Sequence, residues 1–361
     1  MTRRWIGGVF GNTVGSDTPA ETTTGVYSIE QQYYITREGG WIPLAAGGGN
    51  QQIAFGSYVL EVFTAPGTLT VNRTSAFDIF LIGGGGAGGA SYGNNDTGKG
   101  GGGAGQALWR QSIPLGAGTY SVTVGDGGAG RGPESNNSTV GQGAHGASSS
   151  IVLPGSFGGT VTARGGFGGA GSDCNGPYTN TGYGCGGGGG SRNPSCSARQ
   201  SGITGGENTY SGWTSYTGNG GDGNSGNYSG GGGGGCGGNG ANQSGNSNDP
   251  NSQAGAGGVG VNMSPFFGST VGDSGWFGGG GGGGTYCYGG PIAYRAAGGQ
   301  GGGGKGTTAQ ENTQGGASDA SDIDGQANTG GGGGGSSEGD SNPGSNSGSG
   351  GSGIVIVRYS T

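Results

Sequence analysis

The residues that could carry out acid–base catalysis are few in this chain, and their surroundings do not suit that chemistry. Histidine is the most frequent general base, but His145 is the only histidine and stands between alanine and glycine, which favours a turn position. Glu61 and Asp78 lie in segments with the pattern of strands, and no two carboxylates stand out as the pair that a glycosidase needs. We therefore expect a protein that is not an enzyme.

Metal and nucleotide sites have equally little support. The run Asp322-Ile323-Asp324-Gly325 hints at a calcium loop, but Ala320 stands where the first ligand should be and Gly331 where the closing glutamate belongs. Lys99 and Lys305 are each followed by glycine, whereas a phosphate-binding loop needs serine or threonine there. We expect neither a metal ion nor a cofactor.

The cysteines are odd in number and widely spaced. None forms a Cys-x-x-Cys pair, so a zinc site is not expected. An odd count leaves at least one thiol unpaired within the chain. The five positions are Cys174, Cys185, Cys196, Cys236 and Cys287.

Aromatic residues embedded among Gly, Ser and Asn are the remaining candidates for binding. Such mixtures are typical of binding loops, because rigid rings supply contact area and small polar residues adapt to the ligand. The alternative is that the rings cover the ends of glycine-rich rods that otherwise have no core. The candidate receptor-binding residues are Tyr178, Tyr183, Phe266, Phe267 and Trp276.

Glycine dominates the elements that must position these residues. It makes up 108 of 361 residues, including seven in a row at Gly278–Gly284. One isolated tract would remain a flexible coil. Many tracts side by side can instead adopt the polyproline II conformation, in which every N–H and C=O points outward to neighbouring rods. We therefore predict a bundle of polyglycine II helices.

Strand-like segments occur near both ends of the chain and predict a mainly β base of β-sandwich type. They span residues 58–64, 77–82, 106–113, 119–124, 149–153, 160–164 and 353–359. We expect the last to pair with the strands before Arg164, since its apolar edge would otherwise be exposed. One short N-terminal helix is predicted at 29–38, with a capping-box start and a Gly-Gly stop. The predicted domains are 1–45 (attachment or cap), 46–164 (β-rich base), 165–352 (polyglycine II bundle with loops) and 353–361 (closing strand).

The order of the tracts predicts which way each one runs. If they alternate, tracts 83–86, 125–130, 165–171, 230–235 and 301–304 leave the base, and 100–103, 143–147, 186–190, 278–284 and 330–335 return. Far-end loops are then 87–99, 131–142, 172–185, 236–277 and 305–329, with 191–229 and 285–300 at the base. A disulfide needs Cα atoms within about 7 Å. Any bridge should therefore join cysteines at the same end, so the allowed pairs are Cys196–Cys287 and one pair drawn from Cys174, Cys185 and Cys236. Without an oxidising setting all five thiols stay reduced.

Overall composition excludes several classes of protein. A net charge of −7 with only 13 basic residues disfavours nucleic-acid binding. No run approaches the roughly 18 apolar residues of a membrane span, so membrane insertion is not expected. The start Met1–Gly8 lacks the apolar region of a secretory signal, so if the protein works outside a cell we expect it to leave by lysis or another route.

Three segments carry a resemblance to a known group of proteins. They are the strand ending in glycines at 77–86, the Gly-Thr-Tyr-Ser-Val-Thr-Val-Gly element at 118–125 and the ending Gly350–Tyr359. These look like glycine-rich domains of phage tail-fibre and virion proteins, and residues 25–34 are similar to the segment that often precedes them. The layout also resembles tip adhesins of some T-even-like phages, in which polyglycine II helices present variable receptor-binding loops. This chain departs from them in its longer β-rich part and its C-terminal strand.

The resemblance implies a virion structural protein, a tail-fibre or adhesin component found on the virion and, after release, outside the cell. Its implied partners are a host cell-surface receptor, protein or glycan, and other virion tail proteins; a homo-oligomer is possible. Affinity would come from loop residues and be multiplied by copy number. The alternative is a self-assembling extracellular filament or matrix protein whose loops meet other subunits.

Overall fold

The structure is a computed structural model that divides the chain into two units, Met1–Ala45 and Ala46–Thr361. Every strand that the structure describes belongs to the second unit. The predicted helix at 29–38 lies outside the described residues. The residues that the structure describes are 45–90, 98–132, 141–171, 183–190, 205–223, 229–244, 253–285, 295–308, 322–337 and 345–360.

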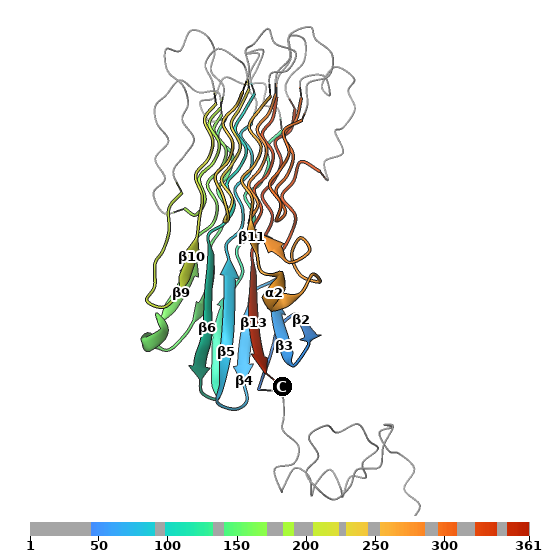
Figure 1. The fold of residues 1–361 in the computed structure, drawn as a ribbon. Coiled ribbons are helices and arrows are strands. Elements are labelled where there is room, and N and C mark those ends of the chain that lie inside the picture. Colours follow the sequence, from blue (N-terminus) through green and yellow to red (C-terminus); the bar gives the residue numbers. More distant parts are fainter. Residues whose placement is uncertain are drawn as a thin grey trace, which may run out of the picture. The chain divides into compact units, whose positions relative to one another are not determined.

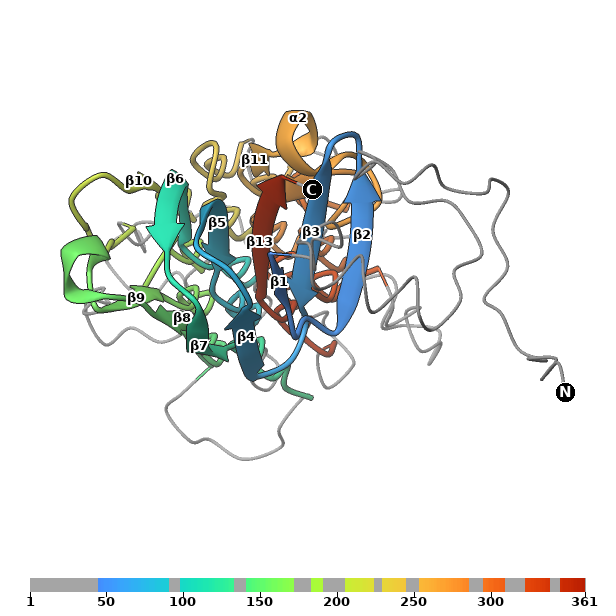
Figure 2. The same ribbon diagram turned by 90° about the horizontal axis from the view of Figure 1, so that it is seen from below.

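Two larger antiparallel sheets lie at one end of the second unit (Figures 1 and 2). The six-stranded sheet has the order β10 (Thr214–Tyr216), β6 (Ala107–Leu115), β5 (Ser75–Ile82), β13 (Ile354–Ser360), β3 (Tyr58–Phe63) and β2 (Gln51–Phe55). The five-stranded sheet has the order β1 (Ala46–Gly47), β4 (Gly67–Val71), β7 (Gly118–Thr123), β8 (Ser149–Val152) and β9 (Thr160–Ala163). A third sheet pairs β11 (Val261–Asn262) with β12 (Trp276–Phe277).

The central strands of the six-stranded sheet are buried on both faces, which explains why most of their residues are apolar. Side chains alternate between the faces of a strand. Phe80 and Ile82 of β5 belong to a core cluster. The cluster also contains Phe267 of α2 (Ser264–Phe267) and Phe277 of β12. The opposite face lies toward β8 and β9 of the five-stranded sheet. The expectation of a mainly β base is therefore confirmed, with its strands in antiparallel sheets. Among the described residues, the helical elements are α2 and the 3₁₀ turn η1 (Gly155–Phe157).

The C-terminal strand β13 occupies the middle of the six-stranded sheet. It pairs antiparallel with β3 on one side and β5 on the other, so that Ile356 lies opposite both Val62 and Phe80. The prediction that the chain ends by pairing with strands before Arg164 is confirmed. The pairing joins residues that are far apart in the chain. Arg358 pairs with Asp78, 280 residues away, and its guanidinium also donates to the Asp78 carboxylate.

From the sheets, glycine-rich runs extend side by side toward what we call the distal end (Figure 1). Successive N–H groups of run 83–90 donate to three neighbours in strict rotation. Gly83, Gly86 and Gly89 donate to run 98–106; Gly84, Ala87 and Ala90 to run 141–148; Gly85 and Gly88 to run 345–353. The backbone therefore returns to the same neighbour every third residue.

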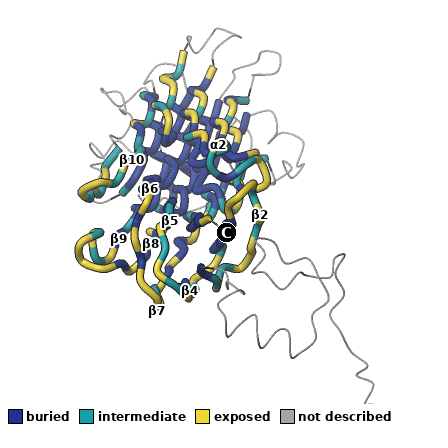
Figure 3. Tube along the Cα trace, turned by 60° about the horizontal axis from the view of Figure 1, so that its bottom comes forward, coloured by how far each residue is buried: buried dark blue, intermediate teal, exposed yellow. Residues whose placement is uncertain are grey.

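Run 98–106 lies inside the bundle. Its N–H groups donate to runs 164–171, 229–236 and 330–337, while its carbonyls accept from runs 83–90, 183–190 and 278–285. Each run donates to some neighbours and accepts from others, so backbone bonds point out in every direction around it. Figure 3 shows the bundle interior as buried chain.

Glycine is required by the closeness of these runs. A Cβ added to Gly85 would overlap the carbonyl group of Gly331, and one added to Gly102 would overlap that of Gly86. Ala87 and Ala104 show that single methyl groups fit at selected points, and both are fully buried. The bundle is therefore packed backbone against backbone.

The direction predicted from the alternating order is correct for six runs and wrong for four. Runs 83–90, 125–132, 164–171 and 301–308 lead away from the sheets, and 98–106 and 141–148 return, as expected. Run 183–190, predicted to return, instead leads away, because Gly184 bonds to Gly165 at the sheet end and Gly188 to Gly101 farther out. Runs 278–285 and 330–337 also lead away instead of returning, and run 229–236 returns instead of leading away.

The error arises from runs that are not continuous glycine. Chain segments 218–223, 238–244, 253–260, 295–300, 322–329 and 345–353 also take part in the bundle through backbone hydrogen bonds. They carry Asn, Asp, Ser, Ala or Gln among their glycines. A single such run between two tracts, such as 322–329 between 301–308 and 330–337, breaks their expected alternation, whereas the pair 238–244 and 253–260 preserves it. The reversal of run 183–190 comes before all of these runs and follows residues 172–182, which lie outside the described residues.

Candidate functional site

Three of the five candidate aromatic residues lie beside the sheet and not at the distal end. Phe267 is fully buried and its ring packs on Phe80, with centroids 5.8 Å apart, and edge-on to Trp109. The ring of Phe266 contacts that of Trp109, with centroids 5.1 Å apart. Trp276 belongs to β12. Their predicted place in a far-end loop is wrong, because run 253–260 returns to the sheets immediately before these residues. Phe267 in particular has no surface to offer a receptor.

Tyr183 starts run 183–190 near the sheets, so its predicted place in a far-end loop is wrong, and it belongs to a small aromatic group. Its ring is 4.0 Å from His145 and 5.4 Å from Phe167, measured between centroids. His145 Nδ1 accepts a hydrogen bond from the Gly168 N–H at 3.0 Å, and burial lowers the pKa of this histidine. The only histidine therefore holds two runs together as a neutral ring. Tyr178 lies outside the described residues.

Two cysteines meet at the sheet end of the bundle. Cys185 and Cys236 are buried free thiols whose sulfur atoms are 4.0 Å apart. Their predicted place at the far end is wrong, since run 183–190 starts and run 229–236 ends beside the sheets. Both runs have the direction opposite to the predicted one, so Cys185 and Cys236 still lie at the same level along the bundle, as expected. Cys174, Cys196 and Cys287 lie outside the described residues.

A polar groove of about 610 Å³ follows the flank of the bundle. Its carboxylates are largely used by the protein itself: Asp273 accepts from the Gly301 N–H at 2.9 Å, and Asp324 from the Ser349 N–H at 2.6 Å. The side chains that line it are those of Asp273, Gln300, Asp322, Asp324, Gln326 and Ala327, with glycines between them.

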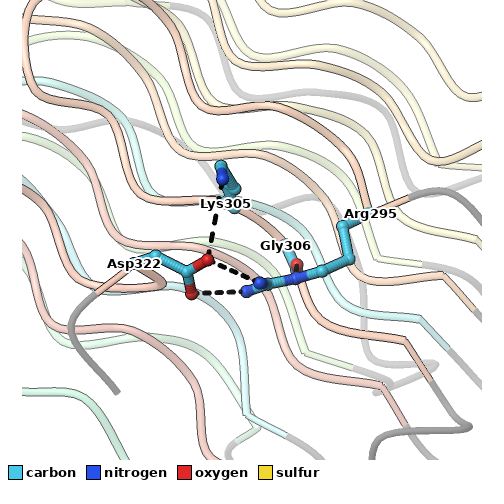
Figure 4. A network of polar contacts seen from close by, with 4 residues as sticks. All are labelled: Arg295, Lys305, Gly306 and Asp322. Atoms are coloured by element: carbon cyan, nitrogen blue, oxygen red, sulfur yellow. Dashed lines mark hydrogen bonds and ion pairs between the residues drawn. The ribbon is translucent and has the colours of Figure 1, made fainter. Parts of the chain in front are cut away.

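Asp322, which lines the groove, belongs to a network of charged groups (Figure 4). The Arg295 guanidinium donates to both carboxylate oxygens of Asp322, at 2.6 and 2.8 Å, and to the Gly306 carbonyl at 2.9 Å. Lys305 Nζ lies 3.6 Å from the same carboxylate. The hydrogen bonds from Arg295 lower the pKa of Asp322, although burial opposes them. The network joins three runs: 295–300, 301–308 and 322–329.

This arrangement places carboxylate and amide oxygens along the wall of a polar groove. Within the described residues, no group of three or more His, Cys, Asp or Glu side chains could hold a metal ion. Glu61 accepts from Tyr359, Gln52 and the Gly49 N–H. Asp78 accepts from Arg358 and the Ser112 N–H. Burial, followed by the Glu61 charge, raises the pKa of Tyr359. These carboxylates stabilise the fold.

Sequence reasoning missed the role of Arg295. Its partner Asp322 was considered only as part of an incomplete calcium loop. The one available signal was the proximity in sequence of Arg295, Lys305 and the Asp322–Asp324 pair within an otherwise almost uncharged region. Nothing in that spacing says which run adjoins which, so the ion pair depends on the bundle.

The structure thus defines a mainly β protein in which strands continue into a packed bundle of glycine-rich runs. A family model described as "Glycine-rich domain" matches residues 64–360. The chain belongs to this glycine-rich domain family. A search of curated proteins finds no match. Among the residues that the structure describes, no helix is both long and apolar enough to cross a membrane.

Proposed function

We propose that this chain is a virion structural protein, a phage tail-fibre or adhesin component that binds a host cell-surface receptor. In this proposal a polyglycine II bundle carries the receptor-binding segments at its distal end, and the sheets form the base. Other virion tail proteins are proposed partners, and a homo-oligomer is possible.

The hydrogen-bond rotation supports the assignment to polyglycine II. That conformation has three residues per turn and no internal hydrogen bonds, and the N–H groups of run 83–90 return to the same neighbour every third residue. The glycines of runs 83–90 and 98–106 do not have positive φ, as expected for the left-handed form. Amide hydrogen exchange should therefore show protection along these runs, although they belong to no sheet.

The observation that carries the proposed function is that many run ends gather at the distal end. Bridges there join Gly98 to Ser337, Ser229 to Thr285 and Thr285 to Thr308. Of the segments between successive distal ends, 91–97 and 224–228 are rich in Ser, Asn and Gly with one Tyr each, and 286–294 holds three Tyr and two Gly. That composition is typical of binding loops. A rigid bundle beneath such segments lowers the entropy cost of binding.

Saturable binding of purified, fluorescently labelled protein to a panel of bacterial strains tests the proposal. Binding should be lost when segments 91–97, 224–228 and 286–294 are replaced by Gly-Ser sequences of equal length. The matched control is Val152→Ser, at an exposed position on the five-stranded sheet, which should bind normally. Binding that survives the replacements would contradict the proposed site. Filaments formed by the protein alone, with no binding to any strain, would favour the alternative of a self-assembling filament.

A further inference from the structure

The two buried cysteines are held together by the backbone around them. Cys185 begins the outward path of run 183–190, and Cys236 ends the return of run 229–236. Beside them, the Gly234 N–H donates to the Gly186 carbonyl at 2.8 Å, so the two runs are in hydrogen-bonded contact at this height.

Both thiols also point to the same acceptor. Cys236 Sγ lies 3.0 Å and Cys185 Sγ 3.7 Å from the Gly105 carbonyl oxygen. The exposed fractions are 3% for Cys236 and 0% for Cys185. The pair lies in the core cluster that also contains Ile82 and Phe277.

We propose that Cys185 and Cys236 form a disulfide that joins the two runs at the sheet end of the bundle. The sulfur atoms must approach from 4.0 Å to the bond length of about 2.05 Å. Side-chain rotation can provide this movement, because the backbones are already adjacent. The proposal does not depend on the proposed function.

The reaction needs an oxidant, which we take to be a small-molecule disulfide such as oxidised glutathione. One cysteine thiolate attacks a sulfur of the oxidant, breaking its S–S bond and releasing one thiolate. The second cysteine thiolate then attacks the mixed disulfide at the protein sulfur, forming the Cys185–Cys236 bond and releasing the second thiolate. The protein loses two protons and two electrons, and the oxidant becomes two thiols.

The timing of the reaction follows from burial. The hydrogen bond with Cys185, together with burial, raises the pKa of Cys236, so its reactive thiolate is scarce in the folded protein. Oxidation should therefore be slow in the native state and faster while the chain folds.

The test is to refold the full chain in a glutathione redox buffer, block free thiols, and map disulfide-linked peptides by mass spectrometry. We expect one linkage between the peptides of Cys185 and Cys236, with two of the protein's five thiols lost to it. The oxidised protein should unfold several degrees higher than the same protein after reduction. Cys185→Ala should remove the linkage, and Cys174→Ser should retain it.

The mapping of the unmutated chain decides the outcome even if Cys185→Ala folds poorly. Folded protein in which both thiols remain free after refolding in an oxidising buffer would overturn the proposal. So would a bridge from either cysteine to Cys174, Cys196 or Cys287.

Discussion

The sheets and the glycine runs of Ala46–Thr361 are stabilised by opposite means. In the sheets, side chains such as Phe80 and Ile356 fill the space between layers and are fully buried. In the runs, the space between neighbours is filled by main chain, and Gly85 lies against the Gly331 carbonyl. One region therefore depends on side chains that are present, and the other on side chains that are absent. The two regions therefore tolerate opposite substitutions: the sheets are damaged when a side chain is removed, and the runs are damaged when one is added.

The two regions are joined by buried polar side chains at the point where strands become runs. The Ser149 hydroxyl donates to the Ile82 carbonyl at 2.7 Å and accepts from the Gly125 N–H at 2.9 Å. The Gln106 amide donates to the Asn208 carbonyl and to Ser215, and accepts from the Arg164 N–H. Backbone groups that leave the sheet ladder thereby keep a partner, which a buried polar group requires.

The largest expected effect comes from removing the strand on which the runs depend. Deleting Gly353–Thr361 removes β13 from the middle of the six-stranded sheet and exposes the edges of β3 and β5. We expect insoluble protein in place of the soluble parent, measured by fractionation after expression, because unpaired strand edges promote aggregation. A soluble truncated protein with protected glycine amides would show that the runs are stable without the sheets.

Adding a single methyl group inside the bundle should be almost as damaging. Gly85→Ala places a Cβ against the backbone of run 330–337, which has no flexible side chain to move aside. We expect a loss of about 4 kcal/mol or more of unfolding free energy, measured by chemical denaturation. Gly155→Ala is the control, because a Cβ at this exposed glycine meets nothing within 4 Å, and should change stability by less than about 0.5 kcal/mol. Equal effects would contradict close backbone packing.

Removing a side chain should be costly only in the sheets. Phe80→Ala leaves a cavity beside Phe267 and Phe277, whose ring centroids lie 5.8 and 5.0 Å away. A loss of about 3–5 kcal/mol is expected from denaturation curves. The matched truncation in the bundle, Ala87→Gly, removes one methyl group and should cost about 1 kcal/mol. A larger loss for Ala87→Gly than for Phe80→Ala would reverse the comparison.

The smallest effect is a pH dependence from the one histidine in the bundle. Because burial lowers its folded pKa below 6.5, the unfolded chain binds a proton more readily. His145 therefore contributes stability that is fully present above pH 6.5 and is lost as pH falls toward the folded pKa. The thermal midpoint should decline modestly between about pH 7 and pH 5, and His145→Gln should flatten this decline. An unchanged slope in the variant would assign the dependence to other groups.

Much of the base could be predicted from the pattern of residues alone. The alternating or continuous apolar segments at 58–64, 77–82 and 353–359 became β3, β5 and β13 within one or two residues. Weaker strands were missed: β4 (Gly67–Val71) was not predicted, and its first residue follows Pro66, which is typical of a turn. The edge strand β2 escaped notice because its exposed residues give little apolar signal.

The candidate site depended on tertiary structure to a greater extent. Glycine content identifies tracts that can pack closely, and this much is a local property, since only glycine lacks a Cβ. It cannot identify runs such as 322–329, where Asp, Gln and Asn interrupt the pattern. Whether a side chain fits depends on which neighbour the Cβ faces, and that neighbour can be hundreds of residues away. The sequence by itself therefore determined the strands and the need for close backbone packing. The direction of each run, the Arg295–Asp322 pair and the meeting of Cys185 with Cys236 were decided only when all the runs were packed together.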